Sequence, residues 1–185
     1  MPQIFMKSLR LAIWFFLPFA FTSYNSPDVR KGESVFVEGR YNLRTSGNQP
    51  MLLQGTIVFS SAIGISSKGK AFSTIKLDLE NNENEKAHSL GFLISKQNWN
   101  EELKRGNYKV PVKIDGFIKN FEGVFGFANI KEMGELPFFA ENGKINISYV
   151  GPKMLYGNLE VKLENSEGKQ LNIRGDFTAI RKTIE

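Results

Sequence analysis

The sequence contains no cysteine and one histidine, His88. The lack of cysteine excludes disulfide bonds, cysteine-ligated zinc or iron–sulfur sites and a thiol nucleophile. A single histidine excludes a His-rich metal cluster and leaves His88 as the one candidate for a histidine-dependent catalytic triad. His88 follows a charged loop and has no neighbouring Ser or Asp pair, so we expect a surface or strand-end histidine rather than a general base.

The signatures of several enzyme classes are also absent. The chain has neither the Gly-x-Ser-x-Gly nucleophile elbow nor the glycine patterns of dinucleotide-binding and phosphate-binding loops. Ser-x-x-Lys begins at Ser67, Ser73 and Ser166, but the motifs and the helix that accompany it in acyl-enzymes are missing. The alternating oxygen ligands from Asp78 to Asn84 lack the glycine and glutamate of a calcium loop. We therefore expect no catalytic residues, no cofactor and no bound metal.

One enzymatic alternative needs no such signature. A glycan-acting hydrolase uses two carboxylates at a fixed separation, which spacing along the chain does not reveal. Candidates for this Asp/Glu pair are the acidic residues near predicted loops: Asp115, Glu122, Glu132, Glu135 and Glu141. Because the chain has 19 acidic residues, some of them come close together in any fold. A non-enzymatic binding domain is the first hypothesis, and hydrolysis is the alternative.

Long apolar runs are absent except near the N-terminus. Lys7 and Arg10 precede and border an apolar stretch over residues 11–21, a pattern typical of a secretory signal peptide, here with cleavage between Thr22 and Ser23. The stretch is shorter than the roughly 20 residues that span a bilayer, so no membrane-spanning segment is expected after processing. The sequence predicts a signal peptide over 1–22, one domain over 23–185, and a location in the periplasm, at the cell surface or outside the cell.

Positive charge is only in modest excess. Removing the signal peptide also removes Lys7 and Arg10, which lowers the formal net charge from +5 to +3. Proteins that bind nucleic acid gather Lys and Arg on one face, whereas the basic groups here are short and separate in sequence. We expect no nucleic-acid partner.

The rest of the chain is typical of β-strands. From Ser34 onward apolar residues recur at every second position, as in half-buried strands. About nine strands without long crossovers predict an all-β antiparallel fold. We favour a two-sheet β-sandwich, and a closed lipocalin-like β-barrel is the alternative. One short helix is predicted over residues 98–106, with Asn98 as its N-cap and Gly106 as its stop.

Four spaced glycine and apolar motifs in the C-terminal half carry a family resemblance. They are Leu103-x-x-Gly106-x-Tyr108, Gly143-x-Ile145-x-Ile147, Gly157-x-Leu159-x-Val161 and Ile173-x-Gly175-x-Phe177. The chain resembles uncharacterised exported bacterial all-β domains, many of them lipoproteins, although it lacks the cysteine that lipoproteins modify. The resemblance implies an exported β-sheet domain and supplies no catalytic residues.

Aromatic side chains outside the clearest alternation are the candidates for a ligand-binding site: Trp99, Tyr108, Phe138 and Phe139. An aromatic ring exposed on a sheet stacks on sugar rings or apolar ligands. The same residues in the core would only fill space. The expected partner of such a site is a glycan, an apolar ligand or an envelope protein.

Overall fold

A computed structural model describes residues 38–47, 50–65, 69–83, 86–97, 101–111 and 122–182, all within the compact unit Val37–Glu185. The predicted signal peptide and its cleavage site at Thr22 and Ser23 lie outside these residues. The described residues contain no α-helix, and no helix among them has the length and apolarity to cross a bilayer. Nine strands and a 3-10 turn are present: β1 (Arg40–Gly47), β2 (Leu52–Ile65), β3 (Ala71–Asn81), β4 (His88–Gln97), β5 (Gly106–Lys109), β6 (Gly123–Ile130), η2 (Lys131–Met133), β7 (Phe138–Val150), β8 (Met154–Glu164) and β9 (Gln170–Arg181).

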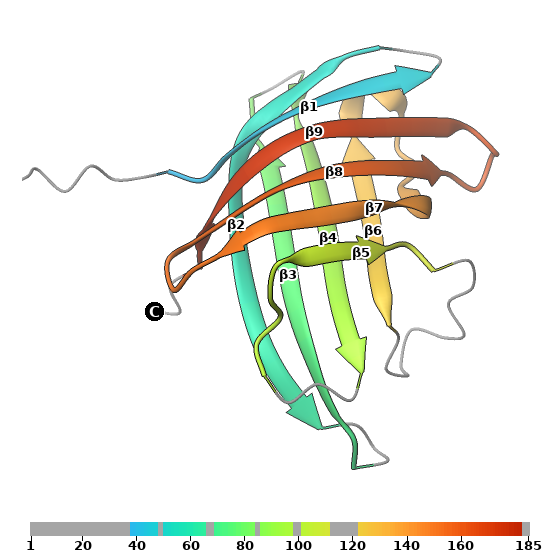
Figure 1. Ribbon diagram of the computed structural model, residues 1–185. Helices are drawn as coiled ribbons and strands as arrows, with labels where there is room; N and C mark the ends of the chain where they lie inside the picture. The colour runs from blue at the N-terminus through green and yellow to red at the C-terminus, as the bar shows by residue number, and fades with distance from the viewer. Residues whose placement is uncertain are drawn as a thin grey trace, which may run out of the picture. The chain divides into compact units, whose positions relative to one another are not determined.

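The strands close into an eight-stranded antiparallel barrel (Figure 1). Around the ring the order is β1, β2, β3, β4, β6, β7, β8, β9, and β9 returns to β1 with Arg40 opposite Thr178. In Figure 1, β1, β9, β8 and β7 cross in front of β2, β3 and β4. The ninth strand, β5, pairs with β7 over residues 144–147, beyond the two positions at which β7 pairs with β6.

The expected all-β antiparallel fold with nine strands is confirmed, and the β-sandwich is wrong. A sandwich has two sheets with free edges, whereas the β1–β9 and β6–β7 pairs join all the walls into one ring. Alternation shows that each strand buries one face, which a sandwich and a barrel both satisfy. Alternation does not show which strands are neighbours. The barrel follows from the pairing of strands in the structure, which alternation does not reveal.

The short helix predicted over residues 98–106 is also not found. Residues 98–100 lie outside the described part, residues 101–105 have no helical structure, and Gly106 begins β5. The ion pair between Lys104 and Glu101 is present at 2.6 Å. A helix this short has little stability of its own, and here Leu103 is instead buried in the core by an irregular segment.

Alternating side chains fill the barrel. The inward positions of the ring strands are mostly apolar, and Phe59, Phe92 and Phe138 are the largest side chains that are fully buried. An eight-stranded barrel either fills its interior with its own side chains or encloses one small ligand. Here the buried side chains occupy that space.

Cross-strand pairs of glycine and an aromatic residue explain why the chain is rich in both. The ring of Phe177 lies where a side chain on Gly157 would project, and Phe92 covers Gly126 in the same way. On the outer surface, Phe127 covers Gly91. An aromatic side chain that lies over a strand glycine fills the missing packing and fixes the register of the two strands.

Candidate functional site

The connections between strands gather at two ends of the barrel. The turns β2–β3 and β7–β8 and the end of β9 lie at one end, which we call the lower end. The turns β1–β2, β3–β4 and β8–β9 and the η2 connection lie at the other, upper end. The two ends differ in how their polar groups are arranged.

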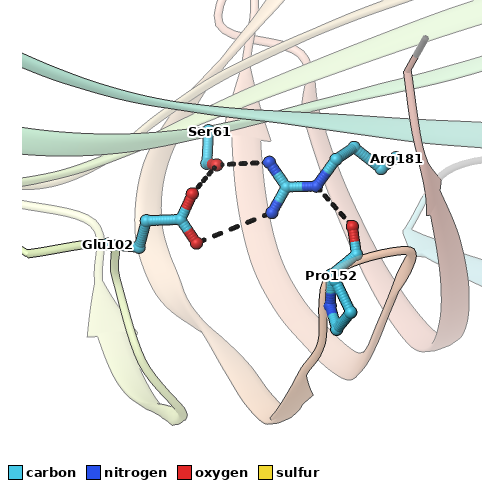
Figure 2. A network of polar contacts seen from close by, with 4 residues as sticks. All are labelled: Ser61, Glu102, Pro152 and Arg181. Atoms are coloured by element: carbon cyan, nitrogen blue, oxygen red, sulfur yellow. Dashed lines mark hydrogen bonds and ion pairs between the residues drawn. The ribbon is translucent and has the colours of Figure 1, made fainter.

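A polar network around Arg181 closes the lower end (Figure 2). The Arg181 guanidinium donates from Nη1 to Ser61 Oγ at 2.8 Å and from Nε to the carbonyl oxygen of Pro152 at 2.7 Å. Ser61 donates in turn to Glu102 Oε1 at 3.0 Å, and Glu102 Oε2 lies 3.6 Å from Arg181 Nη2. The guanidinium carbon is 4.9 Å from the centre of the Phe59 ring. These contacts tie four segments together, so the network is structural and leaves no reactive group free.

The upper end has an open notch in the barrel wall. The β2–β3 ladder begins only at Thr56 opposite Glu80, while residues 52–56 of β2 pair with β1. Before Thr56 in β2 and after Glu80 in β3 the ladder has no further pair, and the Asn81 amide links the two strands by donating to the carbonyl oxygen of Gln54 at 2.8 Å. A hollow of about 780 Å³ lies in this gap.

A buried hydrogen-bonded pair lies beside the notch, and one of its members, His88, lines the notch. Tyr41 Oη lies 2.6 Å from His88 Nε2, and His88 Nδ1 lies 2.7 Å from the carbonyl oxygen of Lys86. Because a carbonyl only accepts, Nδ1 carries the proton in the neutral ring, and Nε2 accepts from the tyrosine hydroxyl. His88 is thus the first residue of a strand, as expected, but it is buried rather than on the surface.

The pKa of the Tyr41 hydroxyl is raised above its ordinary value, first because burial disfavours the phenolate and second because Glu80 is negatively charged. A folded-state pKa above the unfolded value means that the unfolded chain loses its proton first as the pH rises. The contribution of Tyr41 to stability is therefore complete below about pH 10, the unfolded tyrosine pKa, and declines above it. Burial raises the pKa of Tyr108 as well.

Replacing Tyr41 with phenylalanine tests this pair. We expect Tyr41→Phe to lower the free energy of unfolding near neutral pH by about 1–3 kcal/mol, because buried His88 Nε2 loses its donor. Above about pH 10 the free energy of unfolding should fall with rising pH less steeply for the variant than for the wild type. The two slopes should differ by up to about 1.4 kcal/mol per pH unit. Urea unfolding at several pH values measures both effects. Tyr108→Phe is the comparison that keeps the Tyr41–His88 pair, and equal slopes for Tyr41→Phe and wild type would contradict the assignment.

Apolar and acidic side chains line the notch together. Leu53 and Ile130 are buried in its floor, Met51 is half-buried, and Leu52 at the rim is 52% exposed. Among the described residues that line the notch, three carboxylates from two stretches of the chain outnumber one ammonium group, that of Lys86. The carboxylates are those of Glu80, Glu83 and Glu132. The notch therefore combines an apolar surface with a net negative rim.

The four aromatic residues predicted to bind ligand do not form one site. Trp99 lies outside the described residues. Phe138 is 1% exposed and belongs to the core, and Tyr108 is half-buried with its hydroxyl donating to the carbonyl oxygen of Lys104 at 2.6 Å. Phe139 is 45% exposed on the outer surface, where its ring centre lies 6.4 Å from that of Phe125.

The acidic residues proposed for a hydrolase are spread over the surface. Glu122, Glu132 and Glu135 are exposed, and exposed Glu141 pairs with Lys162 at 2.8 Å. Asp115 lies outside the described residues. Glu132 alone of the described candidates lines the notch. Within the described part of the chain, no three acidic or histidine side chains are placed to hold a metal ion.

Sequence reasoning missed the notch because its residues come from four separate stretches of the chain. One local signal was available: Gly55 interrupts the apolar alternation between Leu53 and Ile57. A side chain there would meet the Tyr41 hydroxyl at 2.7 Å and the backbone oxygen of Glu80 at 2.3 Å. The glycine thus makes room for the buried tyrosine beside the notch.

Comparisons with protein families, with curated proteins and with solved structures give no match to this chain. The assignment of a function therefore depends on the geometry of the barrel and its surface.

Proposed function

We propose that this protein is an exported, non-catalytic binding domain whose upper notch takes a small amphipathic molecule that carries a positive charge. The observation that supports the proposal is the notch itself, in which an apolar floor meets a rim of three carboxylates. Its volume of about 780 Å³ lies within the 300–1,000 Å³ typical of ligand sites, which often occur at the mouths of barrels. The N-terminal pattern supports the export part.

This mode of binding differs from that of a lipocalin-like carrier, the barrel alternative suggested by the sequence. A carrier of that kind encloses its ligand inside the barrel. Here Phe59, Phe92 and Phe138 occupy the interior, so the ligand binds at the rim. The Tyr41–His88 pair supports the proposal that the domain is not catalytic. Both ring nitrogens of His88 are engaged in hydrogen bonds, one with the Tyr41 hydroxyl and one with the Lys86 carbonyl.

A matched set of probes tests the ligand class. Calorimetric titration uses n-octylammonium, n-octyl sulfate and n-octyl glucoside, which share an apolar tail and differ in the charge of the head. We expect n-octylammonium to bind at least about tenfold more tightly than n-octyl sulfate, a difference of about 1.4 kcal/mol. Equal affinities, or no binding by any probe, would overturn the proposal. Slow cleavage of the glucoside would instead favour the hydrolase.

Variants assign the binding to the notch. Glu80→Gln/Glu83→Gln/Glu132→Gln should abolish the preference for the ammonium probe, and Leu52→Ser should weaken all three probes alike. The controls change the same residue types elsewhere: Glu122→Gln/Glu135→Gln/Glu167→Gln and Leu136→Ser. Leu136 is an exposed leucine outside the notch. The chain is expressed with its own N-terminal segment, and export predicts that the recovered protein begins at Ser23.

A further inference from the structure

We propose that the outer face of β5, β7, β8, β9 and β1 is a second binding surface, which takes an acidic polysaccharide. Two parallel rows of side chains cross these five strands on the surface. The cation row consists of Lys109, Lys144, Glu160, Arg174 and Arg44. The asparagine row consists of Asn107, Asn146, Asn158, Asp176 and Asn42.

The cation row places like charges directly opposite one another. Lys109 pairs with Lys144, and Arg174 pairs with Arg44, each across neighbouring strands. Like charges in such positions destabilise a sheet. Within the described residues no member of the row takes part in an ion pair, although Glu160 lies between Lys144 and Arg174. Four cations on one face that form no ion pair with any described residue are suited to an anionic ligand.

The asparagine row runs beside the cation row. Asparagine is depleted in strands, so four in register across five strands are not explained by the stability of the sheet. Asn146 Nδ2 donates to Asn107 Oδ1 at 2.6 Å, which shows that the neighbouring amides are close enough to act together. Each amide both donates and accepts hydrogen bonds, as the hydroxyl groups of a sugar require.

Two exposed tyrosines extend the same face. Tyr156 lies two residues from Asn158 along β8, and its ring centre is 5.4 Å from that of Tyr149 on β7. They are 38% and 47% exposed, respectively. Exposed tyrosine rings present a flat apolar surface with a polar edge. The face therefore offers rings, amides and cations in successive rows.

The dimensions and charges favour a polysaccharide over nucleic acid. Five strands spaced about 4.8 Å apart give rows about 19 Å long, enough for an extended chain. A hollow of about 620 Å³ follows the cation row, with Asn142, Lys162 and Asn172 on its other side. Glu160 and Asp176 stand in the rows, and their negative charges oppose the dense phosphates of nucleic acid. A polyuronate, with spaced carboxylates and many hydroxyl groups, matches the face better.

Binding to sodium alginate, a polyuronate, tests the inference, with neutral dextran and single-stranded DNA as the other arms. We expect alginate to bind in low salt, dextran to bind weakly, and DNA to bind at least about tenfold more weakly than alginate. Lys109→Gln/Lys144→Gln/Arg174→Gln should weaken alginate binding about tenfold or more, because the exposed cations act together. Asn146→Ala/Asn158→Ala should weaken it without changing its dependence on salt.

A matched control removes the same charge elsewhere. Lys70→Gln/Lys131→Gln/Lys182→Gln changes three exposed lysines outside the face, and should leave alginate binding within about twofold of the wild type, since specific contacts rather than net charge hold the ligand. Far-UV circular dichroism verifies that each variant is folded. Three results would overturn the inference: no alginate binding, equal loss in the control, or DNA binding as tight as alginate binding. The triple glutamine variant of the notch should bind alginate normally, so the two proposals fail separately.

Discussion

Replacing Phe138 with alanine is expected to lower the free energy of unfolding by about 3–5 kcal/mol. The Phe138 side chain is fully buried at the start of β7, and its removal from a closed ring leaves a cavity that the surrounding strands cannot easily fill. Urea unfolding followed by circular dichroism measures the change. Total stabilities of single domains are commonly about 5–15 kcal/mol, so this one substitution removes a large share.

Phe139 is the matched control for Phe138, because it is the next residue and points to the opposite face. Phe139→Ala should change the free energy of unfolding by less than about 1 kcal/mol, the size expected for one exposed cross-strand aromatic pair. The same Phe→Ala change at two adjacent positions thus isolates the effect of burial on the free energy of unfolding. A larger cost for Phe139→Ala than for Phe138→Ala would show that the inward and outward faces of β7 are exchanged, and equal costs would contradict the difference in burial.

Replacing Gly143 with alanine is expected to cost at least about 2 kcal/mol. Gly143 has a φ of +123°, and a Cβ atom there would lie 2.2 Å from the backbone oxygen of Glu160 on the neighbouring strand. The unusual dihedral costs about 1–3 kcal/mol for a residue with a side chain. The contact adds a similar amount, since a backbone atom in a paired ladder cannot move aside. Thermal and urea unfolding measure the loss.

Gly134 separates the two contributions to the cost at Gly143. Its φ is +108°, but nothing lies within 4 Å of the position that a Cβ atom would take. Gly134→Ala should therefore carry only the dihedral cost, about 1 kcal/mol at the lower end of the usual range. If Gly134→Ala proved as destabilising as Gly143→Ala, the contact with Glu160 would have no energetic role.

The fold class could be predicted from the sequence because two-residue alternation is a local property. The alternation is regular in the C-terminal part, where β7, β8 and β9 form antiparallel pairs joined by short turns. Elsewhere, β2 runs unbroken over Leu52–Ile65, although the apolar alternation in the sequence stops after Phe59. The interruption is the polar inward residue Ser61, which bonds to Arg181 from the other end of the chain. A partner 120 residues away leaves no trace in local spacing.

The candidate site was less predictable than the fold. Phe138 and Phe139 are indistinguishable as aromatic residues, and only the register of β7 shows that one is buried and the other exposed. The notch depends on where the β2–β3 ladder ends, and the cation row depends on five strands being in one register. Both are properties of the pairing between strands, which a short sequence window does not contain.

The pairing of β1 with β9 also constrains how the chain reaches its native state. Strand β1 finds its second neighbour only when β9 is available, so the ring cannot close before residues 170–181 have been synthesised. Such non-local pairing is typical of slow folding, in milliseconds to seconds. Until then both β1 and β8 present unpaired edges on which a holding chaperone can act. This delay would suit the proposed export, since a chain that stays open is still able to thread through a translocation channel.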